Sequence, residues 1–374
     1  MTALLRACLF SGDEGRRAWS AAKGEIEELS VALKQDLRDA RNLVPLLAAA
    51  EVRNAASADR PVRTLLRTGL VREELRIAVF RKVLRAVLSI LRETRAPFAL
   101  TAGSAAMDTW YGPVGPRHTH GIDILTSARG VHAGAVALTA AGFRPLASPD
   151  AGVSITRHDT GLPVRLRSTL SPWLPPAFDS AALLRRAEQC SIAGEQVPIL
   201  AASDALVDIC ATAFDPAQRD GSLWVCDGWL LLKQRAELDW ESVLAVSSET
   251  RLADIVWAAL DFQARDLDAP VPDRVLDSLE GHALPPTALA RDVVLRHLRA
   301  TVGCRRMAST VGSWGRQVSI AGRLAIPSVE YMRRTRHVAH NILLPWHYTL
   351  RMLRFFKGAV GGAAAGFTER GAVL

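Results

Sequence analysis

Paired cysteines and long apolar runs are missing from this sequence, and each absence argues against a class of protein. The five cysteines are scattered without a Cys-x-x-Cys pair, which argues against a disulfide framework and a zinc knuckle. Arg, Lys or His interrupts every apolar run before it reaches the length of a membrane span. The first apolar stretch is also too short for a signal peptide. We therefore predict a cytoplasmic protein with reduced cysteines.

Acidic residues are in slight deficit. The chain has 38 Asp and Glu against 46 Lys and Arg, a formal net charge of +8. Over 374 residues this excess permits contact with nucleotides or an acidic surface but does not require it. Nucleic acid is the least favoured partner, because no helix-turn-helix or aromatic-basic motif is present. High Ala, Arg and Gly with only three Tyr indicates a bacterial source with a GC-rich genome.

Hydrophobic residues make up 49% of the chain, enough for a large core. Apolar residues recur at helical spacing before residue 95 and after about residue 178, whereas short apolar runs and turns lie between them. We predict an α+β fold, with a small mixed β-sheet core flanked by helices. Its predicted parts are an N-terminal helical region (1–95), the α/β core (96–175), a helical C-terminal domain (176–357) and a flexible tail (358–374).

Several elements are predicted individually. Residues 54–61 read as a linker, residues 129–142 as a helix leading into a strand, and residues 153–168 as a β-hairpin that turns at 159–161. Asp239 is predicted to cap the start of a helix. Residues 72–95 read as an amphipathic helix with a basic solvated face. Its predicted buried stripe is Leu75, Val79, Val83, Leu84, Val87, Leu88 and Leu91.

Residues 96–127 form the most informative stretch. Residues 98–100 read as a buried strand, followed by a Gly103-Ser104 turn and an alanine-rich helix. The unpaired N–H groups at the start of such a helix are suited to binding phosphate. A second strand, residues 122–125, carries Asp123 among apolar residues. A carboxylate in that setting needs a cation, a hydrogen bond or a functional reason.

This layout resembles nucleotidyltransferases of the DNA polymerase β type, and more closely the bacterial family of uncharacterised nucleotidyltransferases. The resemblance extends over about residues 35–357, including Trp224 and Asp227 in the helical half. Its specific segments are TAG (101–103), SAAMDTWY (104–111), GPVGPR (112–117) and GIDIL (121–125). It implies a nucleoside triphosphate held by Gly-Ser and Mg²⁺ held by three carboxylates, two of them on one strand.

The sequence departs from this pattern at the residues that would hold the metal. Asp123 is kept, but Gly121 stands where the resemblance implies the other acid of the strand. Arg165 stands at the third carboxylate position, with Arg167 two residues further on, and Ala102 replaces the usual lysine. Loss of two acids removes negative charge that a two-metal site requires. We therefore expect a nucleotidyltransferase fold with weakened or lost metal-dependent transfer, a pseudoenzyme.

The candidate ligand-binding residues follow from these departures. Arginine binds phosphate bidentately and can take the place of a metal ion. The predicted nucleotide- or phosphate-binding residues are Gly103, Ser104, Arg117, Arg165 and Arg167. The basic C-terminal segment is a second candidate for an anionic substrate or a membrane surface, although solvated arginines in a closing helix pair are the favoured reading. Its residues are Arg333, Arg334, Arg336, Arg351, Arg354 and Lys357.

Metal binding remains an alternative at the same place. His120, together with His118, precedes Asp123 and is a candidate ligand of one transition metal, with Asp123 as both metal ligand and catalytic residue. Asp108 and Asp159 are further sources of carboxylate. With these residues, Mg²⁺ and a nucleoside triphosphate are the expected cofactor and ligand.

The favoured function is a nucleotide- or phosphate-binding accessory or tailoring protein of a bacterial biosynthetic pathway. Its expected partner is a nucleotide, a phosphorylated small molecule or peptide, or another protein. Two alternatives stay open: an active Mg²⁺-dependent nucleotidyl- or phosphoryltransferase acting on a small molecule, sugar or peptide, and a scaffold that binds a partner protein or nucleic acid.

Overall fold

The architecture is that of a computed structural model, which describes residues 2–32, 38–56, 58–112, 115–150, 152–170, 180–213, 222–235, 237–250, 252–282, 345, 348 and 349. Those up to residue 282 belong to one compact unit. They combine helices with a seven-stranded mixed sheet, which confirms the predicted fold class. The predicted division into four parts stays a prediction, and the basic residues predicted near the C-terminus lie outside the described ranges.

Three helices precede the sheet: α1 (Thr2–Leu9), α2 (Gly12–Ala32) and α3 (Arg38–Arg53). The sequence predicts helices from residue 15 onward, which cover most of α2 and the whole of α3 but not α1. Helix α1 is short, and it is ordered by burial rather than by its own propensity, because Leu4, Leu5 and Cys8 are fully buried against neighbouring helices. Burial also raises the pKa of the Cys8 thiol to about 12. Cys8, Cys190, Cys210 and Cys226 are free thiols.

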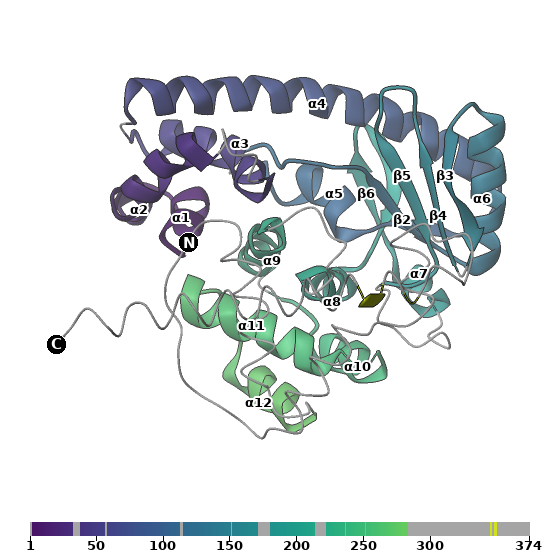
Figure 1. Ribbon diagram of the computed structural model, residues 1–374. Coiled ribbons are helices and arrows are strands. Elements are labelled where there is room, and N and C mark those ends of the chain that lie inside the picture. The colour runs from purple at the N-terminus through teal and green to yellow at the C-terminus, as the bar shows by residue number, and fades with distance from the viewer. Residues whose placement is uncertain are drawn as a thin grey trace. The chain divides into compact units, whose positions relative to one another are not determined.

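Helix α4 (Arg60–Glu93) has 34 residues and starts twelve residues earlier than predicted. Its first half packs on α2 and α3, and its second half packs on α6 (Ala128–Ala140) beside the sheet (Figure 1). The predicted stripe is buried at Val83, Leu84, Val87, Leu88 and Leu91. It is wrong for Leu75 and Val79, which are 66% and 38% exposed. These two residues lie in the middle of α4, between the part that packs on α3 and the part that packs on α6, so none of the described helices covers them there.

The sheet has the strand order β3-β4-β5-β2-β1-β7-β6. Its strands are β1 (Phe98–Leu100), β2 (Ile122–Thr126), β3 (Arg144–Asp150), β4 (Val153–Arg157), β5 (Pro163–Arg167), β6 (Glu188–Ile192) and β7 (Glu195–Ile199). The β2–β5 and β1–β7 pairs are parallel, and the other pairs are antiparallel. The predicted strands at 98–100 and 122–125 and the hairpin at 153–168 are confirmed.

The β6–β7 hairpin is the element that the sequence analysis missed. It lies in the stretch after residue 178 that was expected to be helical, and β7 joins the sheet beside β1. Its strands are only five residues long, and charged or polar residues occupy most of β6. A short edge strand of that kind gives almost no alternating apolar signal, so the sequence could not indicate it.

Successive residues of β2 and β5 face opposite sides of the sheet. Ile122, Ile124, Val164 and Leu166 pack in one core with α4 and α6. Asp123, Arg165 and Arg167 therefore share the opposite face, together with Leu125, which packs in the core formed with the C-terminal helices. The alternation places the charged residues of both strands on one side of the sheet.

That side is covered by helices that follow β5 in sequence, as well as by α5 (Ala102–Thr109) (Figure 1). The later helices are α7 (Ala181–Arg186), α8 (Ala202–Ala213), α9 (Leu223–Gln234), α10 (Trp240–Glu249), α11 (Ala253–Leu267) and α12 (Asp273–His282). Asp239 caps α10 by accepting a hydrogen bond from Ser242 N, as predicted. Within the described ranges, no helix is long and apolar enough to cross a membrane.

Candidate functional site

The site is built on two neighbouring parallel strands. Asp123 on β2 is in register with Arg165 on β5, and Arg165 Nη1 lies 3.1 Å from Asp123 Oδ1. Both side chains are partly exposed, at 29% for Asp123 and 41% for Arg165. The position that the resemblance assigns to a third carboxylate therefore holds a guanidinium that pairs directly with the remaining acid. A cation at this place repels a divalent metal ion.

The first turn of α5 fixes the backbone of Asp123. The Asp123 carbonyl oxygen accepts hydrogen bonds from Thr101 N and Thr101 Oγ1, both at 3.2 Å. The Asp123 N–H donates to Ser104 Oγ at 2.7 Å, and Ser104 is buried. Because α5 begins at Ala102, Gly103 and Ser104 lie within its first turn rather than in a separate turn before it, which corrects the prediction.

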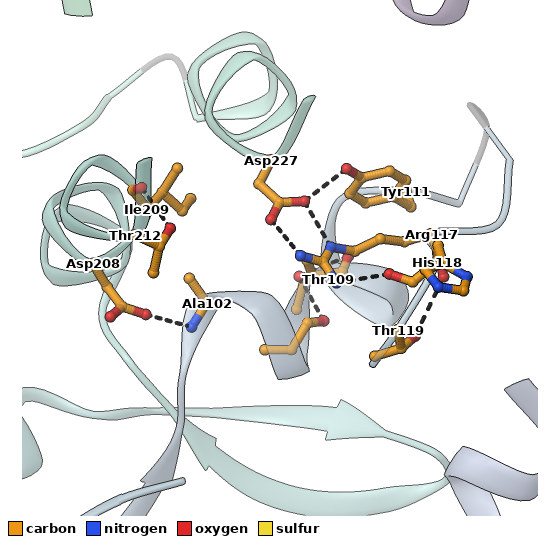
Figure 2. A network of polar contacts seen from close by, with 12 residues as sticks. Ala102, Thr109, Tyr111, Arg117, His118, Thr119, Asp208, Ile209, Thr212 and Asp227 are labelled. Atoms are coloured by element: carbon orange, nitrogen blue, oxygen red, sulfur yellow. Dashed lines mark hydrogen bonds and ion pairs between the residues drawn. The ribbon is translucent and has the colours of Figure 1, made fainter. Parts of the chain in front are cut away.

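The N-terminus of α5 already has an anion beside it, the carboxylate of Asp208 on α8 (Figure 2). Asp208 Oδ2 accepts a hydrogen bond from Ala102 N at 3.2 Å, and Asp208 Oδ1 lies 2.7 Å from Arg167 Nη2. Asp208 is fully buried. Burial raises the pKa of its carboxyl group, while Arg167 and the Ala102 N–H act against that rise. A helix N-terminus and a guanidinium thus bind one internal carboxylate, a pair of donors that also suits phosphate.

Asp208 is the residue that the sequence analysis missed. It lies among apolar residues in the segment ALVDICA, which reads as a buried helix. Like Asp123, Asp208 is an acid among apolar residues, and such an acid needs a partner. No motif drew attention to it, because its partners come from a strand and a helix N-terminus far away in the sequence.

Arg117 is placed apart from Arg165 and Arg167, in a buried ion pair. Its Nε and Nη2 lie 2.8 and 2.7 Å from the two carboxylate oxygens of Asp227, and Tyr111 donates its hydroxyl to the same carboxylate at 2.6 Å (Figure 2). Burial raises the pKa of Tyr111 well above its usual value. This cluster attaches the loop after α5 to α9, and Gly103 lies beside it, where a Cβ would make an ordinary contact of 3.4 Å with Arg117 Nη2.

The histidines and the further acids contact other partners. His118 Nδ1 lies 2.5 Å from Glu73 Oε2, and its ring makes an edge contact with that of His120. Asp108 binds Arg81 and the Ala193 N–H. Asp159 pairs with His158 in the hairpin turn. Among the described residues, no three His, Cys, Asp or Glu side chains come together to hold a metal ion.

The position of Gly121, where the resemblance implies a second acid next to β2, has no room for a side chain. A Cβ at this residue would lie 2.8 Å from the carbonyl oxygen of Pro163 and 2.9 Å from its ring. Since the nearest atom belongs to the backbone of β5, an aspartate there would force the two strands apart. The residues present therefore do not fit the three-carboxylate metal site that the resemblance implies.

Comparison with known proteins identifies a family whose model covers the sheet and the site. The family model of uncharacterised nucleotidyltransferases matches residues 35–267, more than half of the chain and the whole of the sheet and site described above. A comparison with curated proteins found no match. The matched range includes Asp123, Asp208 and Asp227 as well as the three arginines. The chain therefore belongs to the family of uncharacterised nucleotidyltransferases.

Proposed function

We propose that this protein binds a nucleotide or a phosphorylated ligand through Arg165 and Arg167, without metal-dependent nucleotidyl transfer. In this proposal it serves as an accessory or tailoring protein of a bacterial biosynthetic pathway. The observation that carries the proposal is the Asp123–Arg165 pair. Arg165 stands on β5 where the resemblance implies an acid, in register with Asp123 on β2. Its guanidinium neutralises Asp123, the one acid of the pattern that this chain keeps.

Accessibility separates the three predicted arginines. Arg165 is 41% exposed and can reach a ligand from solvent. Arg167 is 12% exposed and lies on the same side of the sheet as Arg165, two residues further along β5. Arg117 is 2% exposed, its Nε and Nη2 bind Asp227, and its Nη1 donates to the His118 carbonyl oxygen. We assign ligand contact to Arg165 and Arg167, and a structural role to Arg117.

The ligand competes with carboxylates of the protein itself. Asp123 and Asp208 are the present partners of Arg165 and Arg167, at 3.1 and 2.7 Å. A phosphate group presents more oxygens and more charge than a carboxylate, so it can replace either partner in a bidentate contact. Binding in this manner exchanges one ion pair for another and needs no bridging metal.

The test is calorimetric titration of ATP and of pyrophosphate into the protein in EDTA. Arg165→Ala is expected to weaken binding at least tenfold, because it removes a charge-assisted contact worth about 1.5–3 kcal/mol. Arg186→Ala is the matched control: Arg186 is 42% exposed and pairs with one aspartate, Asp204, at 2.7 Å, but it lies on α7. Equal affinity in Arg165→Ala and wild type would refute the assignment.

A further inference from the structure

Helix α4 exposes an apolar stripe on its outer side. Val71, Leu75 and Val79 are 55%, 66% and 38% exposed, and with Val52 and Val136 they are the exposed large hydrophobic residues of the described chain. The three follow one another at intervals of four residues and so form a single ridge along the helix. Figure 1 shows α4 at the edge of the unit, with its partners α3 and α6 on one side.

Positive charge flanks this ridge. Arg67, Arg72 and Lys82 are exposed and have no ion pair within the described part of the chain, whereas Glu74 is the one exposed acid between them. Other cations of α4 behave differently, since Arg81 binds Asp108 and Arg92 binds Glu195. Three of the described α4 cations without an ion pair thus lie beside the apolar ridge; the others are Arg60 at the start of the helix and Arg85, which donates to the Ala193 carbonyl oxygen.

We propose that the α4 stripe, defined as Val71, Leu75 and Val79 with the flanking Arg67, Arg72 and Lys82, is a docking surface for an acidic amphipathic helix of a partner protein. A ridge of residues four apart fits the groove between the equivalent rows of a second helix. Acidic residues beside the apolar face of that helix would pair with the three cations, and such complementarity favours this partner over others.

Charge argues against the two occupants that this chain itself offers. The segment after residue 282 has 14 Lys and Arg against three Asp and Glu, so it would meet the stripe with charge of the same sign. A second copy that presented its own stripe would do the same. A membrane surface fits poorly as well, because a helix that lies in a bilayer interface needs a wide apolar face with aromatic residues, and this ridge is one residue wide.

The test uses two synthetic 18-residue helical peptides with leucine at every fourth position, one flanked by glutamate and one by lysine. The protein variant is Leu75→Gln, and Val136→Gln is the matched control, since Val136 is a comparably exposed residue at 57% on α6. Both positions are on the surface, so both variants are expected to fold. Binding is measured by fluorescence anisotropy with labelled peptides.

The glutamate peptide is expected to bind wild type and Val136→Gln equally and Leu75→Gln at least tenfold more weakly, while the lysine peptide does not bind. Binding of the glutamate peptide that is unchanged in Leu75→Gln, or absent from wild type, would overturn the proposal. Co-sedimentation with vesicles of three parts phosphatidylcholine to one part phosphatidylglycerol, lost in Leu75→Gln, would overturn it in favour of a membrane surface.

Discussion

Asp208 and Asp204 show how the position of a carboxylate decides its role. Both lie on α8, both are buried, and each pairs with one arginine at 2.7 Å. Only Asp208 also accepts a hydrogen bond from the N-terminus of α5. In the proposed mode of binding, Asp208 occupies the place of the ligand anion beside Arg167, whereas Asp204 binds Arg186 on α7.

Asp208→Asn is expected to increase the affinity for pyrophosphate at least tenfold. The substitution removes the competing charge and leaves the positive charge of Arg167 and the Ala102 N–H to the ligand. Asp204→Asn controls for lost stability, because it removes the charge of an equally buried carboxylate on the same helix and breaks its pair with an arginine. Calorimetry checks the affinity and urea unfolding checks the stability. Tighter binding in both variants, or in neither, would show that the Asp208 carboxylate does not compete with the ligand for Arg167.

For single residues, the sequence indicated which positions carry the charges of the site, but not which residues they pair with. It located Asp123 and Arg165, and the register of β2 and β5 brings these two together as the alignment of the motifs implied. It placed Arg117 with them, whereas the structure places that arginine on Asp227. The difference is physical: local patterns fix which face of a strand a residue takes, but the helix that approaches that face is set by packing over long sequence distances.

Among the secondary-structure elements, helix α10 depends on Asp239 as its N-cap. Its carboxylate accepts hydrogen bonds from the side chain and the backbone of Ser242, and these lower the pKa of Asp239. A carboxyl group with a lowered pKa in the folded state stabilises the protein above its unfolded pKa. That contribution is lost as the pH falls through the lowered, folded value.

Asp239→Ala is expected to reduce the free energy of unfolding by about 1 kcal/mol at neutral pH, the usual cost of losing an N-cap. The difference from wild type should shrink as the pH falls through and below 3.8, the ordinary pKa of the group. Urea unfolding at a series of pH values measures both effects, with Glu241→Ala in the same turn as control. A difference that does not change with pH would contradict the capping role.

Elements with a strong repeating pattern were predictable, and those without one were not. The helix from residue 128 and the hairpin from residue 153 followed from spacing and turn residues, as did the N-cap of α10. The β6–β7 hairpin and helix α1 did not, since both are short and owe their order to tertiary contacts. In α4 the apolar spacing continues where no neighbour covers it, and there the pattern predicted burial wrongly at Leu75 and Val79.

For the whole molecule, the sheet and its two layers of helices belong to a nucleotidyltransferase family, while the residues at its centre form ion pairs within the protein. Asp123 pairs with Arg165, Arg167 with Asp208, and Gly121 leaves no space for the missing acid. The central claim is that the fold binds a phosphorylated ligand with guanidinium groups in place of metal ions.

Thermal unfolding with each of the four nucleoside triphosphates, in EDTA and in Mg²⁺ or Mn²⁺, tests that claim most directly. A ligand that binds the folded state alone raises stability by RT ln(1 + [L]/Kd), about 2.7 kcal/mol at a hundredfold excess over Kd. We expect a stabilising shift in EDTA that added metal does not increase. A shift that appears only with Mg²⁺ or Mn²⁺ would contradict it and would indicate a metal-dependent transferase.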